Sequence, residues 1–259
     1  MGESKRRKAN TQGSFDDPKV RRSLFKLAFD NTMQVLSDPD REAVHSLRLA
    51  TESFHQTVDR HAMRSAAIGN AECRSGCAAC CHQRVSCLPF EIFIVAYHLL
   101  TKKTPKEIAA LKRRLLEMPK LPLDPDARYG IPCPLLESNR CTVYGQRPSA
   151  CRTMLSKSRA ACDASLAAGG GIIPQIGDPV FLSALLQGGM DYAFIQKLDL
   201  STHLVELGGA LLMALEDFDA VLGSWIDGGD PFQACEVRRP EDPPHKEIVL
   251  QTAKTLNVT

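Results

Sequence analysis

The sequence lacks an apolar run long enough to cross a membrane. The longest candidate, over residues 204–215, is interrupted by Glu206 and rich in small residues, whereas a spanning helix needs about 20 consecutive apolar residues. The basic start of the chain is followed by polar residues 11–17 and not by the apolar stretch of a signal peptide. Arg6 stands where a myristoylation signal needs Ser or Thr. We therefore expect a cytoplasmic protein with no membrane anchor.

The sequence also lacks the common phosphate-binding motifs and a strong charge of either sign. Neither a GxGxxG nor a GxxxxGK motif occurs, and a net charge of +2 favours no particular charged partner. A basic run over residues 5–8 has no interleaved aromatic residues, and no expected helix carries a basic stripe. Nucleic acid is therefore not expected as a partner.

Strand signals are few, and no segment repeats at a fixed period. Apolar residues spaced three or four apart predict helices instead. These begin near Lys19, Pro39, Pro89, Pro105, Pro148, Asp178 and Ser201, and a short one passes through Val221 and Trp225. Ser37 or Asp38 should cap the second, and Ser201 or Thr202 the helix that follows them. We expect a mainly α fold with irregular cysteine-rich metal-binding loops packed among helices and little or no sheet.

The chain of 259 residues, 44% of them hydrophobic, is long enough to bury a substantial core. Its composition predicts five regions. They are a disordered basic N-terminus at 1–18, a helical N-terminal region at 19–69, a cysteine-cluster metal-binding domain at 70–168, a C-terminal helical region at 178–228, and a mostly irregular tail at 229–259.

Cysteine is what the sequence has in excess. Eight of the ten cysteines fall in two bursts, namely Cys73, Cys77, Cys80 and Cys81, then Cys133, Cys141, Cys151 and Cys162. A thiolate bonds strongly to soft or borderline metals, and close spacing lets one loop present several sulfurs to one centre. A disulfide framework is the other use of many cysteines, but it belongs to oxidising compartments and small secreted domains. We therefore expect reduced thiols that bind a metal.

The surroundings of the cysteines leave several roles open. Cys151 should lie near the start of the helix from Pro148, where the helix dipole favours a thiolate. Arg147 and Arg152 flank it, either as donors that offset thiolate charge or as ordinary surface residues. His82 is either a nitrogen ligand or a solvent-facing neighbour. His45, His55 and His61 do not share one helix face, so we expect packing or surface roles for them. Cys87 is expected to be a packed thiol, and Cys235, in the predicted tail, is likewise not expected to be a ligand.

The two bursts and the sequences around them resemble the YkgJ-type cysteine-cluster family of zinc- or iron-chelating domains. The resemblance covers residues 70–165 and includes Glu91 on an apolar helix, the Pro134–Leu136 and Val143–Tyr144 segments, and the Arg147–Arg152 block. It implies that the metal ligands are Cys73, Cys77, Cys80, Cys81, Cys133, Cys141 and Cys151, with Cys162 as an eighth. The family includes relatives of flagellin lysine N-methylase, for which iron-sulfur ligation is implied.

The number of sulfurs bears on the kind of metal. Seven or eight exceed the four of one tetrahedral zinc or one cubane cluster, so they suit two sites or one site with spare thiols. The adjacent Cys80 and Cys81 suggest that neighbouring sulfurs point to different places. The second burst is spread more widely than the knuckles of a zinc ribbon, which favours iron in an iron-sulfur cluster over zinc.

Three functions remain open from the sequence. The first is a metal-binding protein in which the metal holds the cysteine loops together. The second, implied by the resemblance, is an iron-sulfur-dependent protein-lysine N-methyltransferase-like enzyme acting with S-adenosylmethionine on a protein substrate. Its pocket would be lined by Glu91, His82, Tyr144 and Arg152. The third is metal sensing or storage with a responding partner.

Overall fold

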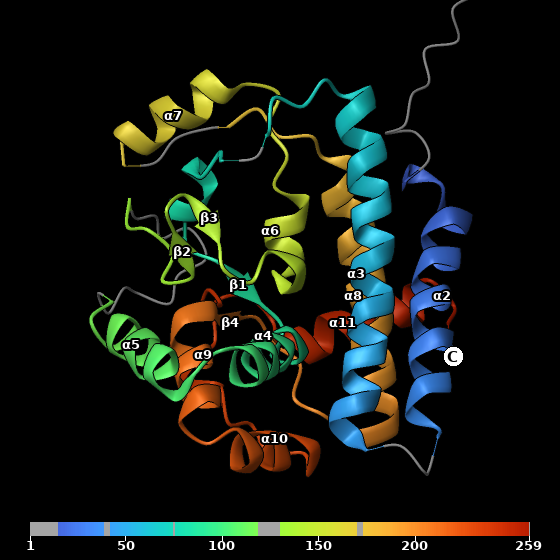
Figure 1. Ribbon diagram of the computed structural model, residues 1–259. Helices are drawn as coiled ribbons and strands as arrows, with labels where there is room; N and C mark the ends of the chain where they lie inside the picture. The colour runs from blue at the N-terminus through green and yellow to red at the C-terminus, as the bar shows by residue number, and fades with distance from the viewer. Residues whose placement is uncertain (1–14, 39–41, 75, 119–129, 170–172, 259) are drawn as a thin grey trace, which may run out of the picture.

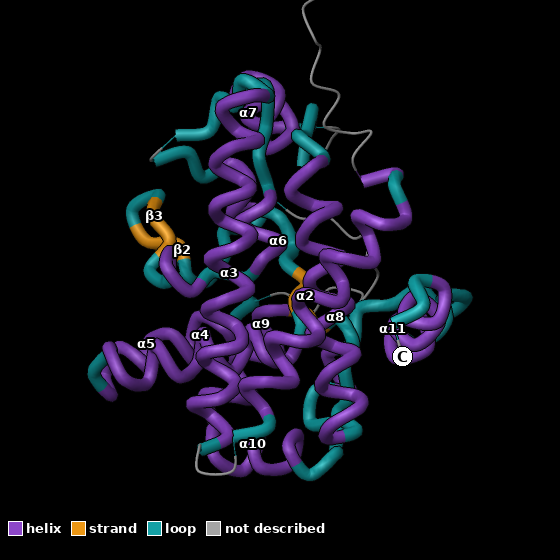
Figure 2. The backbone as a smooth tube through the Cα atoms, turned by 90° about the vertical axis from the view of Figure 1, so that its right-hand side faces the viewer, coloured by secondary structure: helices purple, strands orange, loops and turns teal. Residues whose placement is uncertain are grey.

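The structure is a computed structural model that describes residues 15–38, 42–74, 76–118, 130–169 and 173–258 (Figures 1 and 2). The helices are α2 (Pro18–Leu36), α3 (Ala43–Ile68), α4 (Pro89–Lys102), α5 (Pro105–Leu116), α6 (Ser149–Thr153), α7 (Arg159–Ala167), α8 (Asp178–Leu198), α9 (Leu207–Glu216), α10 (Phe218–Ile226) and α11 (His245–Thr255). Short 3-10 turns are η1 (Ala79–His82), η2 (Tyr144–Gln146) and η3 (Gln233–Cys235). The expected mainly α fold is confirmed.

The sheet content of the described residues is small. Strand β1 (Ser86–Cys87) pairs antiparallel with β4 (Val205–Glu206), with Ser86 opposite Glu206. Strand β2 (Leu136–Glu137) pairs antiparallel with β3 (Arg140–Cys141), with Leu136 opposite Cys141. The first pair joins the cysteine region to the C-terminal half, and the second forms a hairpin within the cysteine region.

Three long helices, α2, α3 and α8, run side by side along one flank of the molecule (Figure 1). Close contact between α2 and α8 depends on Gly189. A Cβ atom there would lie 2.1 Å from the carbonyl oxygen of Phe25 on α2, a separation at which one of the helices must move. The absence of a side chain at Gly189 therefore sets the distance between these two helices.

Helix α4 lies in the centre of the second half of the molecule. Its residues Phe90, Ile92, Phe93 and Val95 are fully buried, which explains the nearly continuous apolar run there. Helices α9, α10 and α5 pack against it (Figure 1), and the ring of Trp225 on α10 lies 5.2 Å from that of Phe93. This core supports the cysteine region.

The cysteine region lies above α4 and beside α3, and comprises η1, the β2–β3 hairpin, α6 and α7 (Figure 1). The helix expected to begin near Pro148 is broken in two, because the chain leaves the helix after Thr153 and a second helix begins at Arg159. Between them, Ser156 pairs with Gln175 in an isolated bridge. Ser158 then caps α7 by accepting a hydrogen bond from the Ala161 amide.

Two expected helix caps were also wrong. Ser37 ends α2, and α3 begins only at Ala43, after Glu42; residues 39–41 lie outside the described residues. Helix α9 is capped by Glu206, whose carboxylate accepts hydrogen bonds from two backbone amides, and not by Ser201 or Thr202. A carboxylate at this position also suits the positive end of the helix dipole.

The tail expected to be mostly irregular over 229–259 contains helix α11. Its residues Val249 and Ala253 pack with Val258 in a second apolar cluster against α2 and α8. This helix was not expected from the sequence, because it is short and its buried contacts come from distant parts of the chain.

At the other end of the chain, Phe15 is buried against His61, so the disorder expected over 1–18 was wrong for this residue. Residues 1–14, including the basic run at 5–8, lie outside the described residues. Residues 119–129 and 170–172 lie outside them as well.

Within the part of the chain that the structure describes, no helix is both long and apolar enough to cross a membrane.

Candidate metal centre

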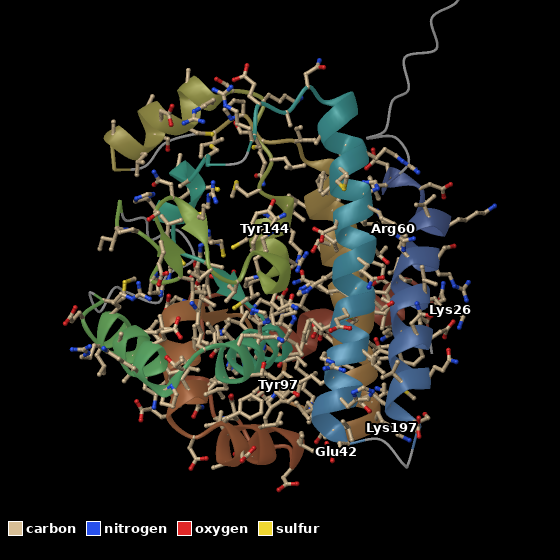
Figure 3. All side chains as sticks on the ribbon, viewed as in Figure 1. Lys26, Glu42, Arg60, Tyr97, Tyr144 and Lys197 are labelled. Carbon is tan, nitrogen blue, oxygen red and sulfur yellow. The ribbon has the colours of Figure 1, made fainter. Side chains whose placement is uncertain are left out.

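The eight clustered cysteines come from separate elements that meet in the cysteine region. Cys73 and Cys77 lie in the loop after α3, Cys80 and Cys81 on η1, Cys133 just before β2, Cys141 on β3, Cys151 on α6 and Cys162 on α7. Sulfur atoms are visible in this part of the molecule, near the labelled Tyr144 (Figure 3). All ten cysteines of the chain are free thiols.

Four of these residues form what we call the Cys73 group: Cys73, Cys77, Cys80 and Cys162. Burial raises the pKa of Cys73, and the charges of the other three thiols raise it further, which places them close to it. The Ser156 amide donates a hydrogen bond to the Cys73 sulfur at 3.2 Å, and α7 packs against η1. The break between α6 and α7 thus allows Cys162 to reach the first burst.

The loop between Cys73 and Cys77 makes a tight turn. The Cys77 amide donates to the Arg74 carbonyl at 3.0 Å, and Gly76 has a φ of 81°. A glycine at this position of a turn adopts positive φ without the steric cost that a side chain brings.

The other four residues form the Cys81 group: Cys81, Cys133, Cys141 and Cys151. The charges of Cys151, Cys133 and Cys141 each act on Cys81, and those of Cys133 and Cys141 act on Cys151. The Cys133 amide donates to the Cys81 carbonyl at 2.7 Å, which fixes the second burst beside η1. Every pair within this group is therefore close, although up to 70 residues separate its members along the chain.

The β2–β3 hairpin presents Cys133 and Cys141 in similar ways. Its two turn residues, Ser138 and Asn139, have φ values of 48° and 59°, as a two-residue type I′ turn requires. The amide two residues after each cysteine, that of Leu135 or Val143, donates to the sulfur and favours the thiolate. The hairpin therefore holds two donors in matching environments.

Adjacent Cys80 and Cys81 belong to different groups but touch each other. The Cys80 thiol donates a hydrogen bond to Cys81, which raises the pKa of Cys80 and lowers that of Cys81. The charge of Cys80 also acts on Cys151. The two groups thus meet at this dipeptide.

Burial and mutual repulsion oppose ionisation of most of the thiols. Burial is the largest cause that raises the pKa of Cys133 to about 11 and that of Cys151 still further. Arg147 acts in the opposite direction on Cys80 and Cys141, although burial still leaves the pKa of Cys141 raised. A bound cation would supply the positive charge that these partly buried sulfurs need as thiolates.

The two arginines beside Cys151 have different roles. The guanidinium of Arg147 lies 4.0 Å from the ring centre of exposed Tyr144. It is also close enough to the sulfurs to lower thiol pKa values, which agrees with the interpretation of Arg147 as a donor that offsets thiolate charge. Arg152 is buried and bonds to Asp59 of α3 and to the backbone carbonyls of Arg147 and Gly145. Arg152 therefore fixes α6 in place.

Glu91 lies beneath the Cys81 group and is fully buried. Its Oε1 accepts hydrogen bonds from the Ser149 amide at 2.6 Å and from His55 Nε2 at 3.2 Å, while its Oε2 accepts from the Leu88 amide at 3.2 Å. Burial favours a raised pKa, but these hydrogen bonds outweigh it and lower the pKa of Glu91. Burial lowers the pKa of His55 despite Glu91, so a neutral His55 donates to an ionised carboxylate.

These contacts change the roles assigned from the sequence. Glu91 and Arg152 were offered as lining of a substrate pocket under the enzyme hypothesis, but both are buried in hydrogen bonds between helices. The packing role expected for His55 is confirmed. Sequence analysis missed Asp59 as a functional candidate. Its spacing of four residues from His55 places both on one face of α3, and this was the signal that could have indicated it.

One ring nitrogen of His82 is already engaged in a hydrogen bond. Its Nδ1 lies 3.0 Å from the Ala78 carbonyl, which can only accept, so Nδ1 carries the proton. The neutral ring then has its lone pair on Nε2. Histidine metal ligands commonly have this arrangement, with one nitrogen held by a carbonyl and the other free to bind.

Cys87 and Cys235 are both buried, and the charge of Cys151 acts on Cys87 but no cysteine acts on Cys235. The Cys87 sulfur lies 3.9 Å from the Val205 carbonyl, and the Cys235 sulfur lies 3.8 Å from that of Met213. Burial raises the pKa of both thiols, that of Cys235 to about 11. The packed position expected for Cys87 agrees with the structure, and Cys235 is packed as well, although it was expected to lie in an irregular tail.

The donor set suits a thiophilic metal. Each group offers four sulfurs, the number that a tetrahedral zinc or a cubane cluster takes. Among the described residues, no three His, Cys, Asp or Glu side chains converge closely enough to hold a single ion. The sulfurs of each group are neighbours whose charges interact.

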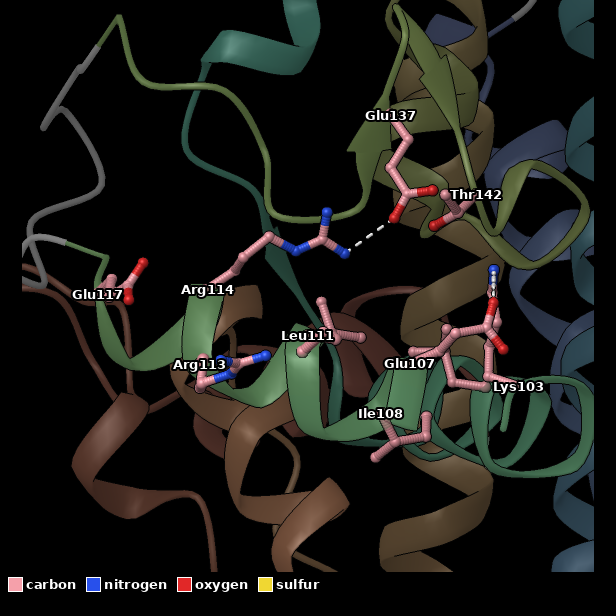
Figure 4. Close-up of a pocket in the computed structure, with 11 residues that line it drawn as sticks. Lys103, Glu107, Ile108, Leu111, Arg113, Arg114, Glu117, Glu137 and Thr142 are labelled. Carbon is pink, nitrogen blue, oxygen red and sulfur yellow. Dashed lines mark hydrogen bonds and ion pairs between the residues drawn. The ribbon is translucent and has the colours of Figure 1, made fainter. Parts of the chain in front are cut away.

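A hollow of about 470 Å³ opens between α5 and the β2–β3 hairpin (Figure 4). Leu99, Ile108 and Leu111 are among its apolar lining residues, and the ion pair between Arg114 and Glu137, 2.9 Å apart, crosses it. None of the eight clustered cysteines lines this hollow.

Comparison with known families bears on the same segment. Residues 72–165 match the family model CxxCxxCC, described as "Putative zinc- or iron-chelating domain". This segment is therefore similar to that family of domains. The match confirms the resemblance drawn from the cysteine pattern, and metal binding by the cysteines follows from the family description. The CxxCxxCC name has two residues between the first cysteines, whereas this chain has three between Cys73 and Cys77. No curated protein and no solved structure matches the chain.

Proposed function

We propose that the protein binds metal at two four-thiolate sites, one in the Cys73 group and one in the Cys81 group. The observation that carries this proposal is the division of the eight sulfurs by mutual electrostatic contact. Within the Cys81 group the thiols act on one another, and within the Cys73 group three thiols act on Cys73. Cys80 and Cys81 link the two sites, and His82 is a further donor beside them.

Of the metals that suit four thiolates, we favour iron in an iron-sulfur cluster. Around one zinc ion, with Zn–S bonds of about 2.3 Å, all four sulfurs must approach a single point. In a cubane cluster each cysteine binds a different iron, so the sulfurs stand farther apart. The wide spacing of the second cysteine burst along the chain, unlike the tight knuckles of a zinc ribbon, supports the cluster. When bound, such a cluster would supply reversible one-electron chemistry.

We favour metal binding over the methyltransferase alternative. That alternative needs an S-adenosylmethionine cavity beside the cysteines, and the hollow at α5 has none of the eight in its lining. We further propose the reducing cytoplasm as the location, because the chemistry of both sites requires thiols that stay reduced. Free thiols at all ten cysteines support this location.

Anaerobic purification followed by metal and acid-labile sulfide analysis tests the proposal. Two cubane clusters give about eight iron and eight sulfide per chain and a visible band that dithionite bleaches. Cys77→Ser/Cys162→Ser and Cys133→Ser/Cys141→Ser should each remove about half of the metal, while the matched control Cys235→Ser should keep all of it. Colourless protein with about two zinc ions would retain the two sites but reject the cluster. Protein that takes up neither metal would refute the proposal.

A further inference from the structure

The shortest helix of the cysteine region is clamped by polar contacts from three longer helices. Helix α6 has five residues, far fewer than an isolated helix needs to be stable in water. It nevertheless carries Cys151 of the Cys81 group. Contacts with the surrounding helices must therefore hold Cys151 in place.

The first contact holds the N-terminal end of α6. The Ser149 amide donates to Glu91 of α4 at 2.6 Å, and His55 of α3 donates to the same oxygen at 3.2 Å. The Ser149 hydroxyl also accepts a hydrogen bond from Gln187 of α8 at 2.7 Å. One buried carboxylate thus joins α3, α4 and α6 two residues before Cys151.

The second contact holds the residue directly after Cys151. The buried guanidinium of Arg152 pairs with Asp59, one turn along α3 from His55. It also donates to the Arg147 carbonyl at 2.8 Å, which closes the preceding η2 turn onto α6. The helix is therefore held on both sides of Cys151 by the same face of α3.

We propose that Glu91, with His55, and Asp59, with Arg152, are positioning residues that set the orientation of Cys151 for metal binding at the Cys81 group. This inference rests on the proposed function. None of the four is a metal ligand in it. Hydrogen bonds around a metal site orient its ligands, and their loss typically lowers metal affinity about 10- to 100-fold.

The test separates a positioning role from a role in overall stability. Cobalt(II), whose thiolate complexes have strong visible absorption, is titrated into the metal-free full-length protein. The Cys77→Ser/Cys162→Ser background leaves only the Cys81 group, and the Cys133→Ser/Cys141→Ser background leaves only the Cys73 group. Glu91→Gln and Asp59→Asn are each introduced into both backgrounds.

Both variants should weaken cobalt binding at the Cys81 group about 10- to 100-fold and change its absorption spectrum, while the Cys73 group keeps its affinity. Equal losses at both groups, together with a lower melting temperature, would show a purely structural role and overturn the inference. Unchanged binding at both groups would overturn it as well. Asp59 is partly exposed, so its variant provides the test even where Glu91→Gln does not fold.

Asp191→Asn is the matched control. Asp191 is a second fully buried carboxylate paired with a histidine, but its 3.0 Å contact with His245 joins α8 to α11. Its loss should lower the melting temperature without changing cobalt affinity or spectrum at either group. If no cobalt, iron or zinc binds to the unsubstituted protein, the proposed function fails instead, and that result is distinct from both outcomes above.

Discussion

Replacing Cys87 with alanine distinguishes a packed thiol from a metal-binding one. Cys87 is only 1% exposed and pairs with Val205 in the β1–β4 ladder. Its sulfur lies 3.9 Å from the Val205 carbonyl, and although the charge of Cys151 acts on it, we expect it to stay a packed thiol. Cys87→Ala should therefore leave the metal content unchanged, whereas Cys151→Ala should remove the metal of the Cys81 group, about half of the total.

The expected loss of stability follows from the size of the deletion. Removing one buried sulfur forfeits about as much transfer free energy as one or two methylene groups and leaves a small cavity. We expect an unfolding free energy about 1–2 kcal/mol lower, which corresponds to a fall in melting temperature of roughly 2–8 °C for a chain of this size.

Thermal unfolding followed by circular dichroism and metal analysis of the same preparations checks both parts. A Cys87→Ala protein with half of the metal would make Cys87 a ligand and refute the division into two groups of four. Unchanged stability would instead contradict the tight packing of the sulfur. Cys235→Ala provides a second packed thiol for comparison, since Cys235 is also buried and contacts Met213.

Two further predictions concern the helices that support the site. Gly189→Ala should lower the unfolding free energy by about 1–3 kcal/mol or more, because its Cβ meets the Phe25 backbone. Gly223→Ala adds a methyl group in open space and should instead raise the unfolding free energy by up to about 1 kcal/mol, measured by the same thermal unfolding. Equal effects of the two substitutions would refute the close contact between α2 and α8. Burial lowers the pKa of His245, but the contact with Asp191 outweighs burial, so the pKa of His245 is raised in the folded protein. The stabilisation of α11 by this pair is therefore complete below the unfolded pKa of about 6.5 and is lost as the pH rises through the folded pKa. The pKa of buried Asp191 is also raised, which likewise lowers stability as the pH rises. Hydrogen exchange in α11 should therefore accelerate with rising pH by more than its intrinsic pH dependence. His245→Gln should abolish this extra acceleration.

Features encoded within a few residues could be predicted from the sequence. The capping box of α5 is one example, since the Thr104 hydroxyl accepts from the Glu107 amide and the Glu107 carboxylate accepts from the Thr104 amide. The apolar run of α4 and the start of α8 at a proline were also visible locally. In each case the residues that give the signal are neighbours along the chain.

Features that depend on distant contacts could not be predicted in the same way. The Glu91 carboxylate meets partners 36 and 58 residues away, so neither its burial nor its role was visible from its place in an apolar helix. Helix α11 forms because Val249 and Ala253 pack against α2 and α8, which only the tertiary fold brings together. The cysteine pattern indicated a metal site, but which sulfurs share a group depends on how α7 and the hairpin return to η1.

The role that we propose for the polar clamp around α6, which comprises Glu91, His55, Asp59 and Arg152, is orientation more than stability. Replacing a buried ionic contact with well-packed apolar residues is often neutral or even stabilising, so stability alone gives little reason to bury Glu91 and Arg152 among three helices. Apolar contacts hold a helix against its neighbours but tolerate small rotations and shifts, whereas hydrogen bonds to Glu91 and Asp59 fix direction as well as distance. A sulfur on a five-residue helix needs that precision, because a small rotation of α6 would turn Cys151 away from the three thiols that share its group. Weakening the clamp should therefore disturb the geometry at Cys151 before it disturbs the fold.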